Sequence, residues 1–70
     1  MRKSIVLHDR FSNEPIVIRT SEINAVRKAF DKTGITAEEY SEILIRVGFI
    51  DVKETIGTVI TKIKKAEGER

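Results

Sequence analysis

Residues 43–66 read ILIRVGFIDVKETIGTVITKIKKA, and this stretch contains signals for both strand and helix. Two short apolar runs flank Gly48, which supplies the backbone freedom of a tight turn and predicts a β-hairpin over 43–53. Thr55 is a typical helix N-cap residue. A narrow apolar stripe with helical spacing follows it, formed by Ile56, Val59, Ile60 and Ile63. Lysines in the final turns suit the helix dipole, and Gly68 can end the helix.

A second hairpin is predicted at the start of the chain. Residues 4–9 alternate weakly, with Ile5 and Leu7 on one side of a strand and Val6 and His8 on the other. The turn formers Ser12 and Asn13 come next. Pro15 then opens a second extended run over 15–19, and proline is acceptable as the first residue of a strand. The order of these signals indicates two antiparallel strands joined by a short loop.

The residues between the two hairpins fit two secondary structures. Ile23, Val26 and Phe30 have helical spacing, and residues 36–39 (TAEE) match a capping box. Three of the five residues over 43–47 are β-branched, however, which favours a strand. Periodicity alone leaves helix and strand as alternatives over residues 21–47.

Size and composition narrow the class of protein. The 70 residues are enough for one small domain over 1–70, whose own core leaves a thin stability margin. The chain has no cysteine and a single histidine, so a disulfide is excluded and a structural metal site is not expected. Self-association is the remaining device that stabilises small domains. No apolar run is long enough for a membrane span or a signal peptide, so a cytoplasmic location is expected.

Four stretches carry a family resemblance, at residues 5–8 (IVLH), 15–18 (PIVI), 23–26 (INAV) and 50–55 (IDVKET). With the helix after them, they resemble the small flagellar and swarming-motility (FlbD/SwrD-like) proteins of bacteria and their short phage relatives. The resemblance covers about residues 5–63 and implies five strands and one C-terminal helix. It therefore favours a strand over 23–30. The chain departs from the family at Gly57 and Thr58, where glutamates are usual, and in a longer loop over 31–39.

The expected fold is α+β, a small antiparallel sheet of about five strands built from hairpins, with one C-terminal amphipathic helix packed on it. The alternation of side chains selects a sheet face that covers the helix, made of Ile16, Ile18, Ile43, Ile45, Val47, Ile50 and Val52. The opposite face also carries apolar residues, namely Val6, Val17 and Leu44, together with Val26 and Phe30. A contiguous apolar set suggests a subunit interface, and the candidates are Val17, Val26, Phe30 and Leu44. The alternative is that the 31–39 loop folds over them.

Catalytic signals are absent from the sequence. No serine or lysine lies in a nucleophile motif, and His8 is interpreted as an ordinary strand residue near a turn. The acidic pairs Glu38–Glu39 and Asp51/Glu54 fit a helix start or a solvated surface better than acid–base chemistry. The four glycines are isolated, so there is no phosphate-binding loop. No enzyme activity, cofactor or catalytic residue is predicted.

The cations suggest a ligand. Strand-borne arginines form a rigid platform whose guanidinium groups match phosphate, and aromatic rings can stack on a base. The candidate residues for binding an anion or nucleotide are Arg19, Arg27, Arg46, Lys53, Tyr40 and Phe49. The alternative is a solvated face on which these cations pair with Asp51 or Glu42. The net charge of +2 is too small to indicate nucleic acid.

Two functions are compatible with these features. The first is a non-catalytic homo-oligomeric binding protein, of the kind that the phage relatives suggest, which sequesters an anionic nucleotide such as a cyclic-nucleotide immune signal. The alternative is a protein-interaction adaptor of the flagellar and swarming-motility type. Both need an exposed surface that meets a second molecule, and neither needs a membrane.

Overall fold

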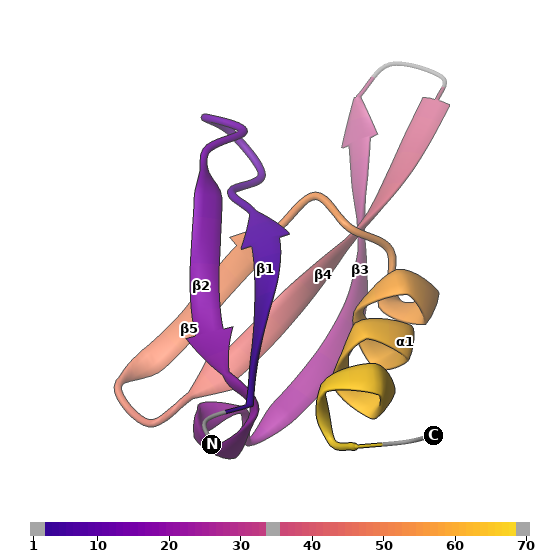
Figure 1. The fold of residues 1–70 in the computed structure, drawn as a ribbon. Helices are drawn as coiled ribbons and strands as arrows, with labels where there is room; N and C mark the ends of the chain where they lie inside the picture. The colour runs from indigo at the N-terminus through magenta and orange to yellow at the C-terminus, as the bar shows by residue number, and fades with distance from the viewer. Residues whose placement is uncertain (1–2, 34–35, 69–70) are drawn as a thin grey trace.

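The computed structural model describes residues 3–33 and 36–68. Its elements in chain order are β1 (Ser4–His8), β2 (Pro15–Arg19), a 3-10 turn η1 (Thr20–Glu22), β3 (Ala25–Thr33), β4 (Thr36–Ile45), β5 (Gly48–Val52) and α1 (Ile56–Ala66). The antiparallel strands form two sheets, one of order β1-β2 and one of order β3-β4-β5, with α1 packed beside them (Figure 1). The predicted α+β class, with about five strands and one C-terminal helix, is confirmed.

The first hairpin forms where the sequence predicts it. Ile5 lies opposite Ile18, and Val6 lies opposite Val17. In the connecting loop, the Asp9 carboxylate accepts hydrogen bonds from the N–H groups of Ser12 at 2.8 Å and Phe11 at 3.0 Å. These donors hold the pKa of the Asp9 carboxyl below its usual value. The loop is therefore ordered by a local side-chain contact.

Residues 25–33 and 36–45 are strands, as the family resemblance implies, and the helical alternative is wrong for them. β3 pairs with β4 from Ala25 opposite Leu44 out to Thr33 opposite Thr36. Ile43 has Val26 on one side and Ile50 on the other, and a β-branched residue packs well in such a paired position. The expected loop over 31–39 is also wrong, because the ladder continues through most of it.

The turn between β4 and β5 lies two residues earlier than predicted. Ile45 pairs with Gly48, so the loop consists of Arg46 and Val47. Val47 was expected on the covered face of the sheet, but it is 87% exposed. The end of the strand removes Val47 from the alternation that the sequence suggested. Gly48 instead opens β5 with a positive φ of 153°.

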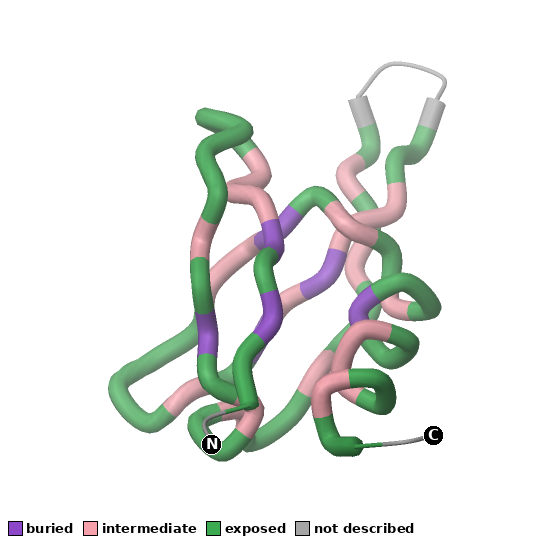
Figure 2. Tube along the Cα trace, in the orientation of Figure 1, coloured by how far each residue is buried: buried purple, intermediate pink, exposed green. Residues whose placement is uncertain are grey.

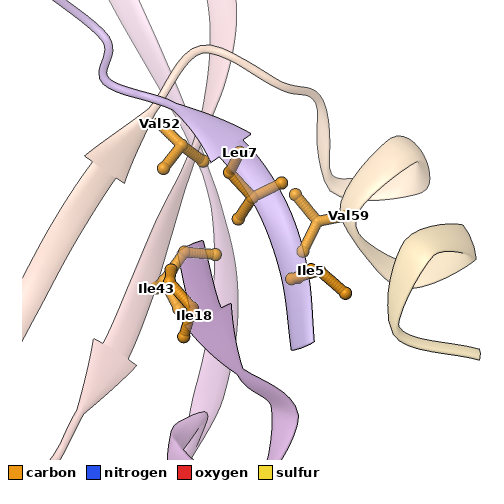
Figure 3. Packing of buried hydrophobic residues seen from close by; sticks show 6 residues of the cluster. All are labelled: Ile5, Leu7, Ile18, Ile43, Val52 and Val59. Carbon is orange, nitrogen blue, oxygen red and sulfur yellow. The ribbon is translucent and has the colours of Figure 1, made fainter. Parts of the chain in front are cut away.

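The core lies between the two sheets and extends to the helix. Its buried side chains come from β1, β2, β4, β5 and α1, and they are Ile5, Leu7, Ile18, Ile43, Val52 and Val59 (Figure 3). Three further residues predicted for the covered face, Ile16, Ile45 and Ile50, are half-buried against this cluster. Figure 2 shows the buried positions where β1 and β2 lie over the three-stranded sheet, and on the side of α1 that faces β1. The hairpin therefore covers one face of the three-stranded sheet.

Main-chain hydrogen bonds join the hairpin to the other sheet. The Lys53 N–H donates to the His8 carbonyl at 3.0 Å, and the Arg10 N–H donates to the Asp51 carbonyl at 3.1 Å. Asp9 forms an isolated β-bridge with Val52 between these bonds. This bridge holds one end of the hairpin on β5 while the rest crosses the inner face of the sheet.

The helix begins and ends as predicted. Thr55 accepts a hydrogen bond from the Thr58 N–H at 3.4 Å, and Gly68 adopts a φ of 91° just beyond the last turn. The buried stripe differs at Ile60, which is 42% exposed, whereas Val59 is fully buried. Ile63 and Ala66 complete the packed side. Within residues 3–33 and 36–68, no helix has the length and apolar content needed to cross a membrane.

Candidate functional site

One surface that the fold leaves uncovered is the outer face of the three-stranded sheet. Val26 on β3, Ile43 on β4 and Val52 on β5 face the core. Because side chains alternate along a strand, the residues next to each of them face outward. We call this the outer face, and the register arranges its side chains in cross-strand rows. The rows are Ala25–Leu44–Phe49, Arg27–Glu42–Asp51, Ala29–Tyr40 and Asp31–Glu38.

The first row is apolar and lies close to the β4–β5 turn. Leu44 is 44% exposed and its cross-strand neighbour Phe49 is 58% exposed. With Ala25 and two charged side chains of the next row, they line a shallow hollow of about 160 Å³. Adjacent exposed apolar side chains make this row a candidate surface for binding another molecule.

The second row is charged but internally paired. The Arg27 Nε atom donates to Glu42 Oε1 at 2.8 Å, and a second guanidinium nitrogen contacts the same oxygen. Beside Glu42, the Asp51 Oδ1 atom is buried and has no hydrogen-bond partner among the described residues. This row thus contains two carboxylates and one guanidinium. Arg27 is already paired with Glu42, as expected for the alternative of a solvated face.

Arg10 forms a cluster that the sequence did not predict. Its guanidinium carbon lies 4.0 Å from the centroid of the Tyr40 ring and 4.6 Å from that of Phe11. The same guanidinium forms an ion pair with Asp31 at the far end of the outer face. Asp31 and Tyr40 are distant from Arg10 along the chain, so no local motif could reveal this contact. The only hint in the sequence is the adjacent Arg10–Phe11 pair in a predicted loop.

A second hollow lies beside this cluster. It has a volume of about 450 Å³ and is lined by Arg10, Glu38, Glu39, Tyr40 and Lys53. The Lys53 ammonium group donates to the Asn13 side-chain carbonyl at 2.7 Å, which holds it near the loop of the first hairpin. The hollow therefore combines an aromatic ring with two cations and two carboxylates.

The six predicted ligand-binding residues do not form one cluster. Arg27 and Phe49 line the small apolar hollow, and Tyr40 and Lys53 line the larger one. Arg19 lies at the end of β2 and lines a different hollow, whose walls include Ile45. Arg46 belongs to the β4–β5 turn. The side-chain alternation in the sequence places these residues together only if all the strands form one continuous sheet. The strands form two sheets instead, and this division separates the residues.

The four predicted interface residues are likewise divided. Val17 projects from the hairpin on the side away from the core, and Leu44 lies on the outer face of the other sheet. Val26 packs against the core, opposite Ile43, so its placement on an outward face was wrong. Phe30 shares the side of β3 that carries Val26 but is exposed. The expectation of one contiguous second apolar face is therefore not met.

His8, Glu54 and Glu39 make contacts that hold elements of the fold together. The His8 Nδ1 atom lies 2.7 Å from Glu54 Oε2, and the His8 N–H donates to Glu54 Oε1 at 3.0 Å. Burial raises the pKa of the Glu54 carboxyl, but the hydrogen bonds from His8 outweigh it, and the pKa lies below its usual value. Glu39 accepts a hydrogen bond from the Ile56 N–H at the start of the helix. In the described part of the chain, no three acidic, histidine or cysteine side chains gather as a metal site would require.

Comparison with known proteins adds no relative. No family model, no curated protein and no solved structure matches this chain.

Proposed function

We propose that this chain is a non-catalytic, homo-oligomeric binding protein. The observation that carries the proposal is the uncovered outer face, on which Leu44 and Phe49 form one apolar row with Ala25. The hairpin and the helix both cover the opposite side of the same sheet. A cytoplasmic location is part of this proposal, supported by the absence of cysteine.

The small core supports self-association. Six residues form the buried cluster of the described chain, and several other apolar side chains are only half-buried. A domain of this size buries only about 60% of its unfolded surface, so contacts with another copy add needed stability. The measurement is the molar mass by light scattering after gel filtration, which we expect to be a multiple of 8.0 kDa. A clean monomer at micromolar concentration would contradict the homo-oligomeric part of the proposal.

The ligand that fits the outer face best is a protein. Its apolar row is bordered by the Arg27–Glu42 pair and by Asp51, which resembles the apolar centre and polar rim of protein interfaces. The mixture of charges favours a partner with both signs over a simple anion. This is the adaptor function, in which the outer face docks on a second protein.

Substitution of the apolar row tests the adaptor function. A photocrosslinking residue at position 49 identifies the partner, whose affinity is then measured with purified proteins. The variant L44T/F49T removes apolar contact area while keeping strand propensity, and we expect it to weaken binding about tenfold or more. The matched control is V6T/V17T, on the outward side of the hairpin, which should bind like the wild type. Equal affinities for all three proteins would rule out the outer face as the docking site.

A nucleotide is the second candidate ligand, favoured by the hollow beside Tyr40. A ring for stacking and the cations Arg10 and Lys53 lie together there. A phosphate would have to compete with Asp31 for Arg10 and avoid Glu38, so the affinity should be modest and should fall with salt.

Titration with a panel of cyclic nucleotides tests this candidate. We expect at least one of them to raise the melting temperature, and K53Q to reduce that rise because it removes a cation from the hollow. The control K64Q removes an exposed lysine of the helix and should leave the rise unchanged. The absence of any thermal or calorimetric response at high micromolar concentration would exclude the nucleotide.

A further inference from the structure

The edge of the sheet at β3 is long and unpaired. In the order β3-β4-β5, β3 pairs with β4 on one side, and no described strand lies on its other side (Figure 1). β2 is a shorter edge and begins with Pro15, while the end of β5 is covered by the bridge from Asp9. β3 extends over nine residues with unused backbone donors and acceptors. An exposed edge of this length is a template for another strand.

The charge pattern of β3 is complementary to the same pattern read in the opposite direction. From residue 27 the strand reads RKAFD, with two cations before Ala29 and an aromatic ring and a carboxylate after it. We propose that β3 pairs antiparallel with β3 of a second copy, about a two-fold axis at Ala29. The two three-stranded sheets then join into one six-stranded sheet. This inference rests on the homo-oligomeric function proposed above and specifies its partner strand and register.

The proposed register brings favourable pairs together on both faces. On the outer face, Arg27 lies opposite Asp31 of the second copy, and symmetry repeats this ion pair. On the other face, Lys28 lies opposite Phe30 of the second copy and makes a cation–π contact with its ring. Within one chain, the Lys28 ammonium already lies 5.9 Å from the centroid of the Phe30 ring, so the two side chains have suitable reach.

Neighbouring registers place like charges together. An axis at Arg27, Lys28 or Asp31 sets that residue opposite its own copy. An axis at Phe30 sets Lys28 opposite Lys32. Like charges directly opposite one another destabilise a strand pair. An axis between two residues would set an outward residue of one copy opposite an inward residue of the other. The outer face of one sheet would then continue into the core side of the other, and that core side would be exposed. Among these arrangements, the axis at Ala29 is the one without a conflict.

The intrachain ion pairs are compatible with this contact. The Arg27 side chain is 73% exposed although it pairs with Glu42, and a guanidinium has five N–H donors. Arg27 can therefore accommodate a second carboxylate while it keeps the first. The Asp31 side chain is 43% exposed beside Arg10, which leaves acceptor positions free. Because the two-fold axis is perpendicular to the sheet, both outer faces of the dimer point to the same side.

Exchange of the two charges tests the register. We expect R27D and D31R each to weaken dimerisation about tenfold or more, because each places like charges opposite one another twice. The double variant R27D/D31R should recover most of the affinity. Glu42 and Arg10 are unchanged in the double variant, so the intrachain pairs stay broken and cannot explain a recovery. R19D, which alters a cation on β2, is the matched control and should dimerise like the wild type.

The outcomes separate this inference from the proposed function. A wild type that is oligomeric but insensitive to both single variants overturns the pairing at β3 and leaves the homo-oligomeric function standing. A monomeric wild type overturns both. A double variant that folds by circular dichroism yet stays monomeric overturns the register. Hydrogen exchange gives an independent readout on the wild type, since β3 amides that point away from β4 should become more protected as concentration rises. Rates that do not depend on concentration contradict the pairing.

Discussion

Replacement of Leu7 by alanine is expected to remove about half or more of the free energy of unfolding. Leu7 is fully buried on β1, in the cluster that also contains Val52 of β5 and Val59 of α1 (Figure 3). Truncation of a buried leucine costs about 2–5 kcal/mol, because transfer energy is lost and a cavity remains. A chain of this length has a total stability of roughly 4–10 kcal/mol. One side chain therefore accounts for a large share of it, since it joins the hairpin, the sheet and the helix.

Urea denaturation followed by circular dichroism measures this effect. We expect the midpoint of L7A to fall sharply, with an unfolding slope close to that of the wild type. Val17→Ala is the control, because Val17 belongs to the same hairpin but is 69% exposed. Its cost should stay within about 0.5 kcal/mol. Equal midpoints for the two variants would show that the hairpin does not cover the core in solution.

Glu54→Gln is expected to have the second largest effect on stability. The Glu54 side chain is 11% exposed and receives hydrogen bonds from the ring and the main chain of His8. Loss of the charge weakens both bonds, and we expect a cost of about 1–2 kcal/mol near neutral pH. The lower part of this range is favoured, since the His8 side chain is 39% exposed and solvent screens the pair.

The same carboxyl makes the stability depend on pH. Its pKa is lowered in the folded protein below the ordinary value of 4.5, so the unfolded chain binds the proton more readily. The stabilisation by Glu54 is therefore complete above about pH 4.5, and it is lost as the pH falls through the lower pKa of the folded protein. E54Q should lose less stability than the wild type over this acid range. It should keep some acid sensitivity, because the pKa of Asp9 is lowered as well.

Denaturation at a series of pH values checks the linkage. The free energy of unfolding of wild type and E54Q should converge as the pH falls from neutral to acid. Glu14→Gln is the control, because Glu14 is an exposed acid in the loop of the first hairpin. Its curve should run parallel to that of the wild type. A parallel curve for E54Q as well would mean that the His8–Glu54 contact does not persist in solution.

The elements whose signals come from residues close together in the sequence were predictable. Thr55 and Gly68 mark the ends of the helix through local hydrogen bonding and backbone freedom, and the structure confirms both. Pro15 and the polar loop before it marked the first hairpin for similar reasons. The covered faces of β2, β4 and β5 followed from simple alternation, apart from Val47, which lies in the turn between β4 and β5.

Residues 25–45 needed information from outside the segment. Ile43 fits a helical face or a strand equally well by spacing, and its cross-strand neighbours Val26 and Ile50 decide between them. The same holds for residues 31–39, which were expected to form a loop longer than that of the resembled family. Residues 31–33 and 36–39 belong to the two strands because each strand supplies backbone partners to the other. Pairing across a sheet is a nonlocal interaction that leaves only a weak trace in the pattern of one strand.

The sequence by itself determined the number and type of the flanking elements and the candidate cations and aromatic residues. Only the tertiary structure decided which of these residues meet, because the strands divide into two facing sheets. That division placed Val26 against the core, set Val17 and Leu44 on opposite sides, and brought Arg10 onto Tyr40. The physical reason is that side-chain alternation assigns a residue to one face of its own strand. Which element covers that face depends on how the whole chain packs.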